Sequence, residues 1–217
     1  MRVVIAGGHG KVALRLTQLL ADRGDEPIGL IRSEEQGADI EARGGAWEVV
    51  DLESAAVGEL ADLMEGADAV VFAAGAGPGS GAERKLTVDR NAALLLIDAA
   101  KAAGVGRYVM LSAAQVDHYD PDSADVMQVY LRAKSEADAE LRASGLDWTI
   151  VRPGSLTNDT ATGHVQIGVG EHDSVSRADV AAVIAACLHD PASIGHQFEF
   201  AAGEVPIEDA IRAPSRA

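Results

Sequence analysis

The chain has 217 residues, of which 47% are hydrophobic and only 4% aromatic, enough to build one α/β domain over residues 1–217 around an aliphatic core. Its 34 acidic and 18 basic residues give a formal net charge of −16, which argues against nucleic acid or an anionic membrane surface as a partner. The single cysteine, Cys187, excludes an intramolecular disulfide and cysteine-type metal clusters, so we expect no bound metal.

Short β-branched runs alternate with longer helical patterns, which is typical of a parallel sheet whose strands are joined by crossover helices. Several of the runs are almost continuously apolar, as expected for strands covered on both faces. The expected strands are Arg2–Ala6, Pro27–Ile31, Trp47–Val50, Ala69–Ala73, Arg107–Leu111, Trp148–Val151 and Gln197–Phe200. Apolar stripes predict helices after Gly10, at about 92–103, at about 123–144 and after Ser176, where Ser176 and Asp179 fit a capping box.

The first expected strand leads directly into a glycine-rich turn at the start of a helix, Gly7-Gly8-His9-Gly10-Lys11-Val12-Ala13. Gly7 permits a tight turn, Gly10 lets a phosphate approach the backbone amides, and Ala13 lets the helix pack close to the sheet. The amide donors and the positive end of the helix dipole attract phosphate groups. The pyrophosphate of a dinucleotide is therefore expected to bind at Gly7, Gly8, His9, Gly10, Lys11 and Val12.

The end of the second expected strand indicates which dinucleotide is preferred. An NAD-specific site usually places an acidic residue about twenty residues after the glycine turn. Here the strand ends in Arg32, whose guanidinium suits a 2′-phosphate and favours NADP(H) over NAD(H). The alternative is a solvated arginine neutralised by Glu34 and Glu35. Asp51, followed by Leu52 after the third strand, fits either an acceptor for the adenine amino group or a helix N-cap.

A second glycine-rich segment follows the fourth expected strand and predicts a mobile loop, Gly75-Ala76-Gly77-Pro78-Gly79-Ser80-Gly81. It is either a simple connector or a flap over a ligand, because open α/β sheets bind ligands beyond the carboxyl ends of their parallel strands. The sequence leaves both interpretations open.

Tyr130 and Lys134 lie four positions apart on an expected helix, and hence on the same side of it. In one interpretation, Lys134 binds the nicotinamide ribose and lowers the pKa of Tyr130, which passes a proton to a substrate carbonyl as hydride arrives. The alternative is a core tyrosine beside a lysine that buries only its aliphatic stem. Cys187 lies on the apolar stripe of the last expected helix and is interpreted as a core residue.

Further segments complete a resemblance to a known family. In chain order they are Ala73-Ala74-Gly75, Arg107–Ser112, Tyr130-x-x-x-Lys134, Asp147–Gly154 and Ser176–Ala181. Together with the glycine turn, they make about residues 1–211 resemble the atypical short-chain dehydrogenase/reductases. More narrowly, the chain is similar to the small NAD(P)H-binding proteins of the NmrA-like or sugar-epimerase-like type.

The resemblance implies a three-layer Rossmann fold, in which a doubly wound, mostly parallel, seven-stranded sheet carries a small C-terminal lobe. It implies that the adenosine side of the cofactor site is lined by Ala73, Ala74 and Gly75, and that the nicotinamide lies near Pro153 and Gly154. It also makes the segment 153–217 a lid and wall on the substrate side, with polar groups at Thr157, Asn158 and His164.

The family's catalytic arrangement includes a serine or threonine just after the fifth strand, often the third residue of a serine run. This chain reads Ser112-Ala113-Ala114, so Ser112 is the available candidate, although it sits early. If Ser112 does not reach the substrate, Gln115 or a backbone amide takes its place, or catalysis is weak or absent. In the following loop, His118 and Tyr119 are interpreted as surface side chains rather than substrate contacts.

We therefore expect an NADP(H)-dependent oxidoreductase for a small carbonyl or alcohol, with Tyr130 as general acid or base, Lys134 as ribose anchor and Ser112 as a third catalytic residue. One alternative is a non-catalytic NADP(H)-binding redox sensor or regulatory protein, which the missing serine run favours. Another is a sugar epimerase or dehydratase, although the short C-terminal portion leaves little room for a nucleotide sugar. No apolar run approaches the roughly 20 residues of a membrane-spanning helix, so we expect a cytoplasmic protein.

Overall fold

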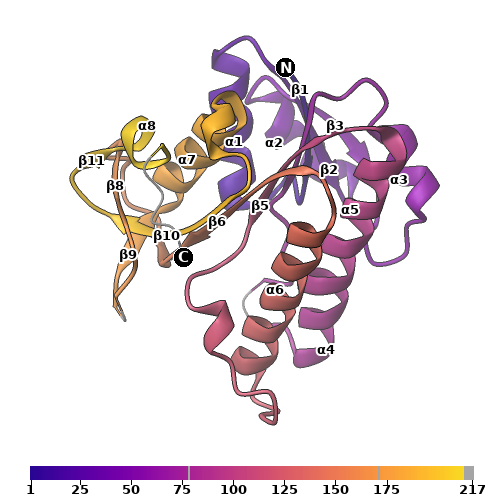
Figure 1. Ribbon diagram of the computed structural model, residues 1–217. Helices are drawn as coiled ribbons and strands as arrows, with labels where there is room; N and C mark the ends of the chain where they lie inside the picture. Colours follow the sequence, from indigo (N-terminus) through magenta and orange to yellow (C-terminus); the bar gives the residue numbers. More distant parts are fainter. Residues whose placement is uncertain (78, 171, 213–217) are drawn as a thin grey trace.

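A twisted, mostly parallel sheet forms the centre of the computed structural model, which describes residues 1–77, 79–170 and 172–212 (Figure 1). Within these residues the sheet has nine strands in the order β11-β8-β10-β6-β5-β4-β1-β2-β3. The strands from β10 to β3 all pair in parallel. They are β1 (Arg2–Ala6), β2 (Glu26–Ile31), β3 (Ala46–Val49), β4 (Ala69–Phe72), β5 (Arg107–Leu111), β6 (Asp147–Pro153) and β10 (His196–Ala202).

The Rossmann fold class is confirmed, and each of the seven expected strands is present as a parallel strand of the sheet. The expectation that the sheet contains only these seven strands was wrong, because it has nine. Two short strands, β8 (His164–Ile167) and β11 (Val205–Pro206), extend the sheet beyond β10 with antiparallel pairing. Both lie at the edge of the sheet and are largely exposed, so neither has the continuous apolar run by which a central strand is found in a sequence.

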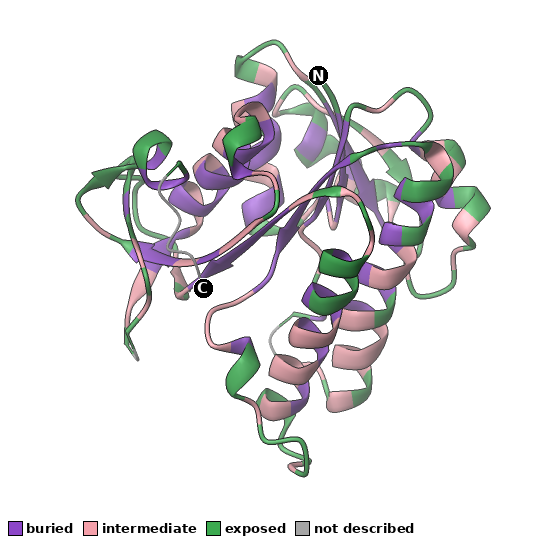
Figure 2. Cartoon of the chain, in the orientation of Figure 1, coloured by how far each residue is buried: buried purple, intermediate pink, exposed green. Residues whose placement is uncertain are grey.

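Helices cover both faces of the sheet (Figure 1). One face carries α1 (Lys11–Asp22) and α7 (Arg177–His189); the other carries α3 (Val57–Leu63), α5 (Ala92–Ala103) and α6 (Val126–Ala143). In β1, Val3 and Ile5 pack in the cluster of the first face, and Val4 and Ala6 pack in the cluster of the second. Figure 2 shows the resulting buried sheet between two amphipathic layers.

Capping residues fix where two of the helices begin. Ser176 Oγ accepts a hydrogen bond from the Asp179 amide at 2.9 Å, so the predicted capping residue at the start of α7 is confirmed. The helix expected from about residue 123 begins instead at Val126, because the Asp125 carboxylate accepts hydrogen bonds from the amides of Met127 and Gln128 and caps α6 there.

The helix expected at about 92–103 is longer than its apolar stripe. It starts with α4 (Ala82–Arg84), widens into a π-helical segment, η2 (Lys85–Asn91), and continues as α5. Polar residues dominate the early turns, so the apolar pattern marks only the last part of the helix. Such widened turns occur frequently at functional sites, and this one borders the cavities described below.

The C-terminal part forms a small lobe beside β10 (Figure 1). It contains β8, β11, the helix α8 (Ile207–Ala210) and a separate two-stranded parallel sheet of β7 (Ser155–Thr157) and β9 (Ser174–Ser176). One further short helix, α2 (Gly37–Glu41), precedes β3. Among the described residues, none of the helices combines the length and apolar character that crossing a membrane requires.

Candidate cofactor site and active site

The glycine-rich turn after β1 is packed tightly between β2 and the segment that follows β4. Gly7 has a φ of +79°, and a Cβ at this position would lie 2.6 Å from the Ala74 Cα. A Cβ at Gly8 would lie 2.6 Å from the Gly29 Cα in β2, and the Gly8 amide donates to the Leu30 carbonyl at 2.9 Å. Glycine is therefore required at both positions by the backbone geometry of the turn itself.

The amino end of α1 presents unpaired backbone donors to the space above this turn. The first intrahelical bond runs from the Leu14 amide to the Gly10 carbonyl at 2.9 Å, which leaves the amides of Lys11, Val12 and Ala13 available. Neither a side-chain cap nor an acidic residue occupies the first turn. The Val12 side chain is buried in the core, so Val12 offers only its backbone to the site. These donors suit an anionic group such as a pyrophosphate.

A cleft of about 270 Å³ lies beyond the carboxyl ends of β1 and β4, where the strand order reverses. Most of the residues that the sequence assigned to the cofactor line it: Gly7, His9, Gly10, Arg32, Asp51, Leu52, Ala73, Ala74 and Gly75. Gly8 lies beneath the turn and Lys11 is exposed at the start of α1. The cleft thus joins four loops, those that follow β1, β2, β3 and β4.

Arg32 is exposed at the end of β2 and reaches the cleft. Among the described residues the structure shows no ion pair between Arg32 and Glu34 or Glu35, and Glu35 instead accepts a hydrogen bond from Ser33 at 3.0 Å. Arg32 is thus solvent-exposed and outside ion-pair distance of Glu34 and Glu35, while its charge contributes to the lowered pKa of Glu53 on the cleft wall. The guanidinium is available for an anionic ligand.

Asp51 does not cap a helix, because α3 begins only at Val57. Its carboxylate accepts a hydrogen bond from the Glu53 amide at 3.0 Å and so closes a local turn. Glu53 also lines the cleft and was missed by sequence reasoning. It binds Arg84 at 2.9 Å and Thr87 at 2.6 Å, and the hydrogen bonds from these two side chains lower the pKa of Glu53.

A larger cavity of about 870 Å³ adjoins the cleft and shares with it Ala73, Ala74 and Gly75. Its other walls come from the second glycine-rich segment, from η2 and from α6; Pro78 of that segment lies outside the described residues. This position favours the flap interpretation of the segment over a simple connector. Tyr130 and Lys134 both line the cavity, as their spacing on one helix predicts.

Lys134 is only 3% exposed and is held by three different groups. Its ammonium group donates to the Leu111 carbonyl at 3.2 Å, lies 3.6 Å from Asp89 Oδ1 and stands 5.2 Å from the centroid of the Phe72 ring. Asp89, which is 1% exposed, also accepts a hydrogen bond from the Ala76 amide at 3.2 Å. Asp89 was missed by sequence reasoning because it lies in the polar part of the long helix.

The pKa of Tyr130 is raised, and not lowered as the sequence suggested. Burial of the phenol is the main cause, and the negative charges of Asp89 and Asp138 add to it. The ammonium of Lys134 does not reverse the shift because Asp89 compensates its charge. The phenol is therefore protonated in the neutral pH range.

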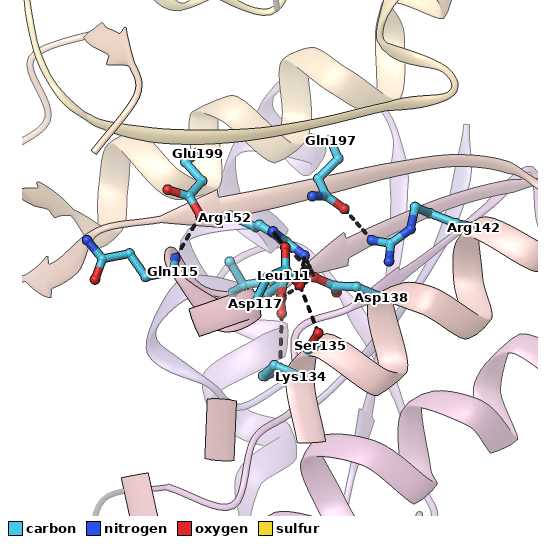
Figure 3. A network of polar contacts seen from close by, with 11 residues as sticks. Leu111, Gln115, Asp117, Lys134, Ser135, Asp138, Arg142, Arg152, Gln197 and Glu199 are labelled. Atoms are coloured by element: carbon cyan, nitrogen blue, oxygen red, sulfur yellow. Dashed lines mark hydrogen bonds and ion pairs between the residues drawn. The ribbon is translucent and has the colours of Figure 1, made fainter. Parts of the chain in front are cut away.

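Ser112 lines the larger cavity, but its hydroxyl belongs to a buried polar network. Figure 3 shows Asp117, Asp138 and Arg152 of this network. Ser112 Oγ donates to Asp138 Oδ2 at 2.8 Å, and Arg152 Nε donates to the same oxygen at 2.9 Å. Arg152 also donates to Asp117 at 2.6 Å. Burial raises the pKa of Asp138 even beside this arginine. The sequence did not reveal this network, because Ser112 and Asp138 come from different elements.

A third cavity of about 300 Å³ continues from the larger one past Ser112 and Tyr130. Pro153 and Gly154 line it, on the side where the nicotinamide was expected. Gln115 lines it as well. Its backbone is in a left-handed conformation with a φ of 59°, and its backbone amide donates to the Glu199 carboxylate at 2.7 Å. Gln115, which the sequence offered as an alternative to Ser112 for orienting the carbonyl, therefore lies in the wall of this cavity.

The C-terminal segment contributes to the walls through Leu156, Val169 and Asp173 rather than through the polar residues that the sequence suggested. Thr157, Asn158 and His164 line none of the three cavities, and their polar atoms bind nearby groups, namely the Asp159 amide, Arg177 and the Thr162 carbonyl. His118 and Tyr119 also line none of these three cavities.

Neither the cysteine nor a metal centre forms part of the site among the described residues. Cys187 is buried in the core, as the sequence predicted, and burial raises the pKa of its thiol to about 12. Within the part of the chain that the structure describes, no cluster of three or more histidine, cysteine, aspartate or glutamate side chains is arranged to hold a metal ion.

Comparison with known proteins identifies the family. The model of a family described as NAD(P)H-binding matches residues 7–191. The chain belongs to the NAD(P)H-binding family. A nicotinamide cofactor follows from this membership, and the site described here fits such a group, because the free amides of α1 face the cleft without an acidic residue in the first turn.

Individual relatives cover almost the whole chain. The uncharacterized sugar epimerase YhfK of Bacillus subtilis is 36% identical over 214 residues, 98% of this chain and 99% of that protein. An epimerase/dehydratase-like protein of Bacillus halodurans has a solved structure with a TM-score of 0.88 and 38% identity, which covers 97% of this chain and 98% of that one. The oxidoreductase ylbE of Lactococcus lactis gives a TM-score of 0.83 at 28% identity, over 97% and 95% of the two chains. The resemblance to NAD(P)H-binding proteins of the sugar-epimerase-like type is confirmed.

Proposed function

We propose that the protein is a cytoplasmic NADP(H)-dependent oxidoreductase that acts on a small carbonyl or alcohol. The observation that carries the proposal is the position of Tyr130 and Lys134 on one wall of a cavity that is continuous with the cofactor cleft. A lone, buried cysteine is also compatible with a reducing compartment.

Each of these residues has a distinct task. Tyr130 lines the cavity with its hydroxyl protonated, and it donates that proton to a carbonyl oxygen as hydride transfer makes the oxygen basic; its raised pKa makes it a weaker acid than a free phenol. Lys134 is fixed by Leu111 and Asp89 at the edge of the cavity, where it orients a ribose hydroxyl. When bound, the nicotinamide supplies or accepts the hydride. The glycine-rich segment above the cavity excludes water from the reacting groups.

Arg32 supports the choice of NADP(H). It lies at the end of β2 in the cleft, in the position where an NAD-specific protein of this fold has an acidic residue. Among the described residues its guanidinium forms no ion pair within 4.0 Å, although its charge helps to lower the pKa of Glu53, so binding of a 2′-phosphate there breaks no existing ion pair. Charge-assisted, paired hydrogen bonds to a phosphate are the strongest contacts that an arginine makes.

The proposed role of Tyr130 is tested by replacing Tyr130 with Phe. Purified protein is assayed for NADPH oxidation with a panel of aldehydes, ketones and quinones. We expect Tyr130→Phe to slow turnover by at least tenfold, because general acid catalysis contributes about 10²–10⁴-fold, while the Kd for NADPH stays unchanged. Tyr119→Phe is the matched control, since Tyr119 lies outside the three cavities. Equal turnover in the wild type and Tyr130→Phe contradicts the proposal.

One observation favours a second candidate, a non-catalytic NADP(H)-binding redox sensor or regulatory protein. The Ser112 hydroxyl donates its hydrogen bond to Asp138, so this hydroxyl is not free to orient a substrate carbonyl. A sensor binds NADPH but shows no turnover across the whole panel, whereas a reductase turns over at least one compound.

The activity in the name of the Bacillus subtilis relative, sugar epimerase, gives a third outcome of the same assay. An epimerase interconverts sugars without net oxidation of the cofactor. Its activity is detected as a change in the sugar while the absorbance of NADPH stays constant.

A further inference from the structure

We propose that Lys85 binds a carboxylate group of the substrate, so that the substrates are apolar carbonyl compounds carrying one carboxylate. This inference rests on the proposed function, because it places the substrate beside Tyr130. Lys85 belongs neither to the glycine-rich turn after β1 nor to the pair formed by Tyr130 and Lys134.

Lys85 is the first residue of η2 and lines the larger cavity. Its ammonium group donates to the Gly77 carbonyl at 3.1 Å and lies 5.1 Å from the centroid of the Tyr130 ring. The glycine-rich segment and the aromatic face thus fix the position of the ammonium group next to the proposed proton donor. Neither contact neutralises its charge.

The second lysine in the cavity differs from Lys85 in this respect. Lys134 is buried and lies 3.6 Å from the carboxylate of Asp89. For Lys85, the described residues include no carboxylate within 4.0 Å, which is the limit of an ion pair. Asp125 lines the same cavity, but its carboxylate accepts hydrogen bonds from the Met127 and Gln128 amides at the start of α6. Lys85 is therefore the cation of this cavity that is free to pair with a ligand.

The rest of the substrate wall is apolar. Val126 and Met127 in the first turn of α6 are 40% and 60% exposed, although both are large hydrophobic residues, and both line the cavity. Leu156 lies on the wall formed by the C-terminal segment. A ligand with an apolar body covers these side chains, while a polar group at one end fixes its orientation.

The charge of the cavity favours a carboxylate over a phosphate. A phosphate group carries up to two negative charges and is typically bound by several amides or by arginine. Here Lys85 is the one uncompensated ammonium group of the described lining, because Lys134 is paired with Asp89, and the Asp125 carboxylate that also lines the cavity repels additional negative charge. A singly charged carboxylate matches this arrangement.

Binding experiments without turnover test the inference directly. Protein saturated with NADP⁺ is titrated calorimetrically with hydrocinnamate and octanoate, and with the corresponding neutral amides. We expect the wild type to bind the acids more tightly than the amides, and Lys85→Met to weaken the acids by about tenfold, as loss of a charge-assisted contact does, while the amides change little.

Two further variants sharpen the result. Lys85→Arg keeps the positive charge and is expected to retain the preference for the acids. Lys101→Met removes an exposed lysine of α5 outside the cavity and is expected to behave like the wild type. Equal binding of acids and amides by the wild type, an unchanged preference in Lys85→Met, or binding of none of the four compounds overturns the inference.

These outcomes are separate from a failure of the proposed function. If no carbonyl compound supports NADPH oxidation but the acids bind through Lys85, the oxidoreductase proposal fails and the carboxylate site stands. If Tyr130→Phe slows turnover but Lys85→Met does not alter the binding of the acids, only the present inference fails.

Discussion

Asp89 connects two parts of the proposed active site through a single buried side chain. One of its oxygens lies 3.6 Å from the Lys134 ammonium group, and the other accepts the Ala76 amide of the glycine-rich segment at 3.2 Å. Its charge both compensates Lys134 and raises the pKa of Tyr130. The acid strength of the phenol therefore depends on a residue that is not itself in the Tyr-Lys pair.

Replacing Asp89 with Asn tests this dependence. A raised pKa keeps Tyr130 protonated, so reduction of a carbonyl should decline only at strongly alkaline pH in the wild type. Asp89→Asn removes a negative charge and leaves the Lys134 charge uncompensated, both of which lower the pKa of Tyr130. We expect the alkaline decline of the rate of reduction to move to lower pH by about one unit or more.

Asp98→Asn is the control for this experiment, because Asp98 is an exposed residue of α5. Its pH profile should match that of the wild type. A profile of Asp89→Asn that is reduced in amplitude but unshifted in pH would show that Asp89 serves only the structure of the site.

At the scale of elements, the turn after β1 is held by the close approach of two backbones. The Cβ of an alanine at position 8 would lie 2.6 Å from the Gly29 Cα, and backbone atoms of β2 have no room to move aside. A Cβ at Gly29 would itself lie 2.7 Å from the Ile40 Cδ1 and 3.3 Å from the Gly8 Cα, so a glycine in β2 leaves room for the turn on one side and for α2 on the other.

The variant Gly8→Ala tests this packing. We expect it to lower the free energy of unfolding by about 2–3 kcal/mol, as overpacking of a well-packed site does. Gly58→Ala is the matched control, because Gly58 lies in α3 with no atom within 4 Å of the added Cβ, and it should stabilise the protein by about 0.5–1 kcal/mol. Urea denaturation of both variants gives the measurement, and equal stability of the two contradicts the account of the turn.

The elements differ in how far the sequence alone predicts them. The central parallel strands are predictable because burial on both faces gives them nearly continuous apolar runs, as in Val3, Val4 and Ile5 of β1, whereas the edge strand β3 is mostly exposed. Polar segments give no such pattern, so η2, with Lys85 and Asp89, was missed. The hydrogen bond from Ser112 to Asp138 spans 26 positions and depends on how α6 packs against β5, which local sequence does not encode.

At the scale of the whole molecule, three adjoining cavities follow the carboxyl ends of the central strands, from the adenosine side at β2 to the lobe beside β10. The net charge of −16 opposes the binding of an anionic cofactor. Local donors must therefore outweigh that field, and they are concentrated here at the start of α1 and at Arg32. The fold provides the place for a dinucleotide, whereas the chemistry depends on the side chains around it.

The central claim is that this site binds NADP(H) through α1 and Arg32. Calorimetric titration of the wild type and of Arg32→Ala with NADPH and NADH tests it most directly. We expect the wild type to bind NADPH more tightly, and Arg32→Ala to lose about tenfold or more in affinity for NADPH while the affinity for NADH changes little. Arg23→Ala, at the far end of α1, should bind both like the wild type. Equal weakening of both cofactors by Arg32→Ala, or a wild type that binds neither, contradicts the claim.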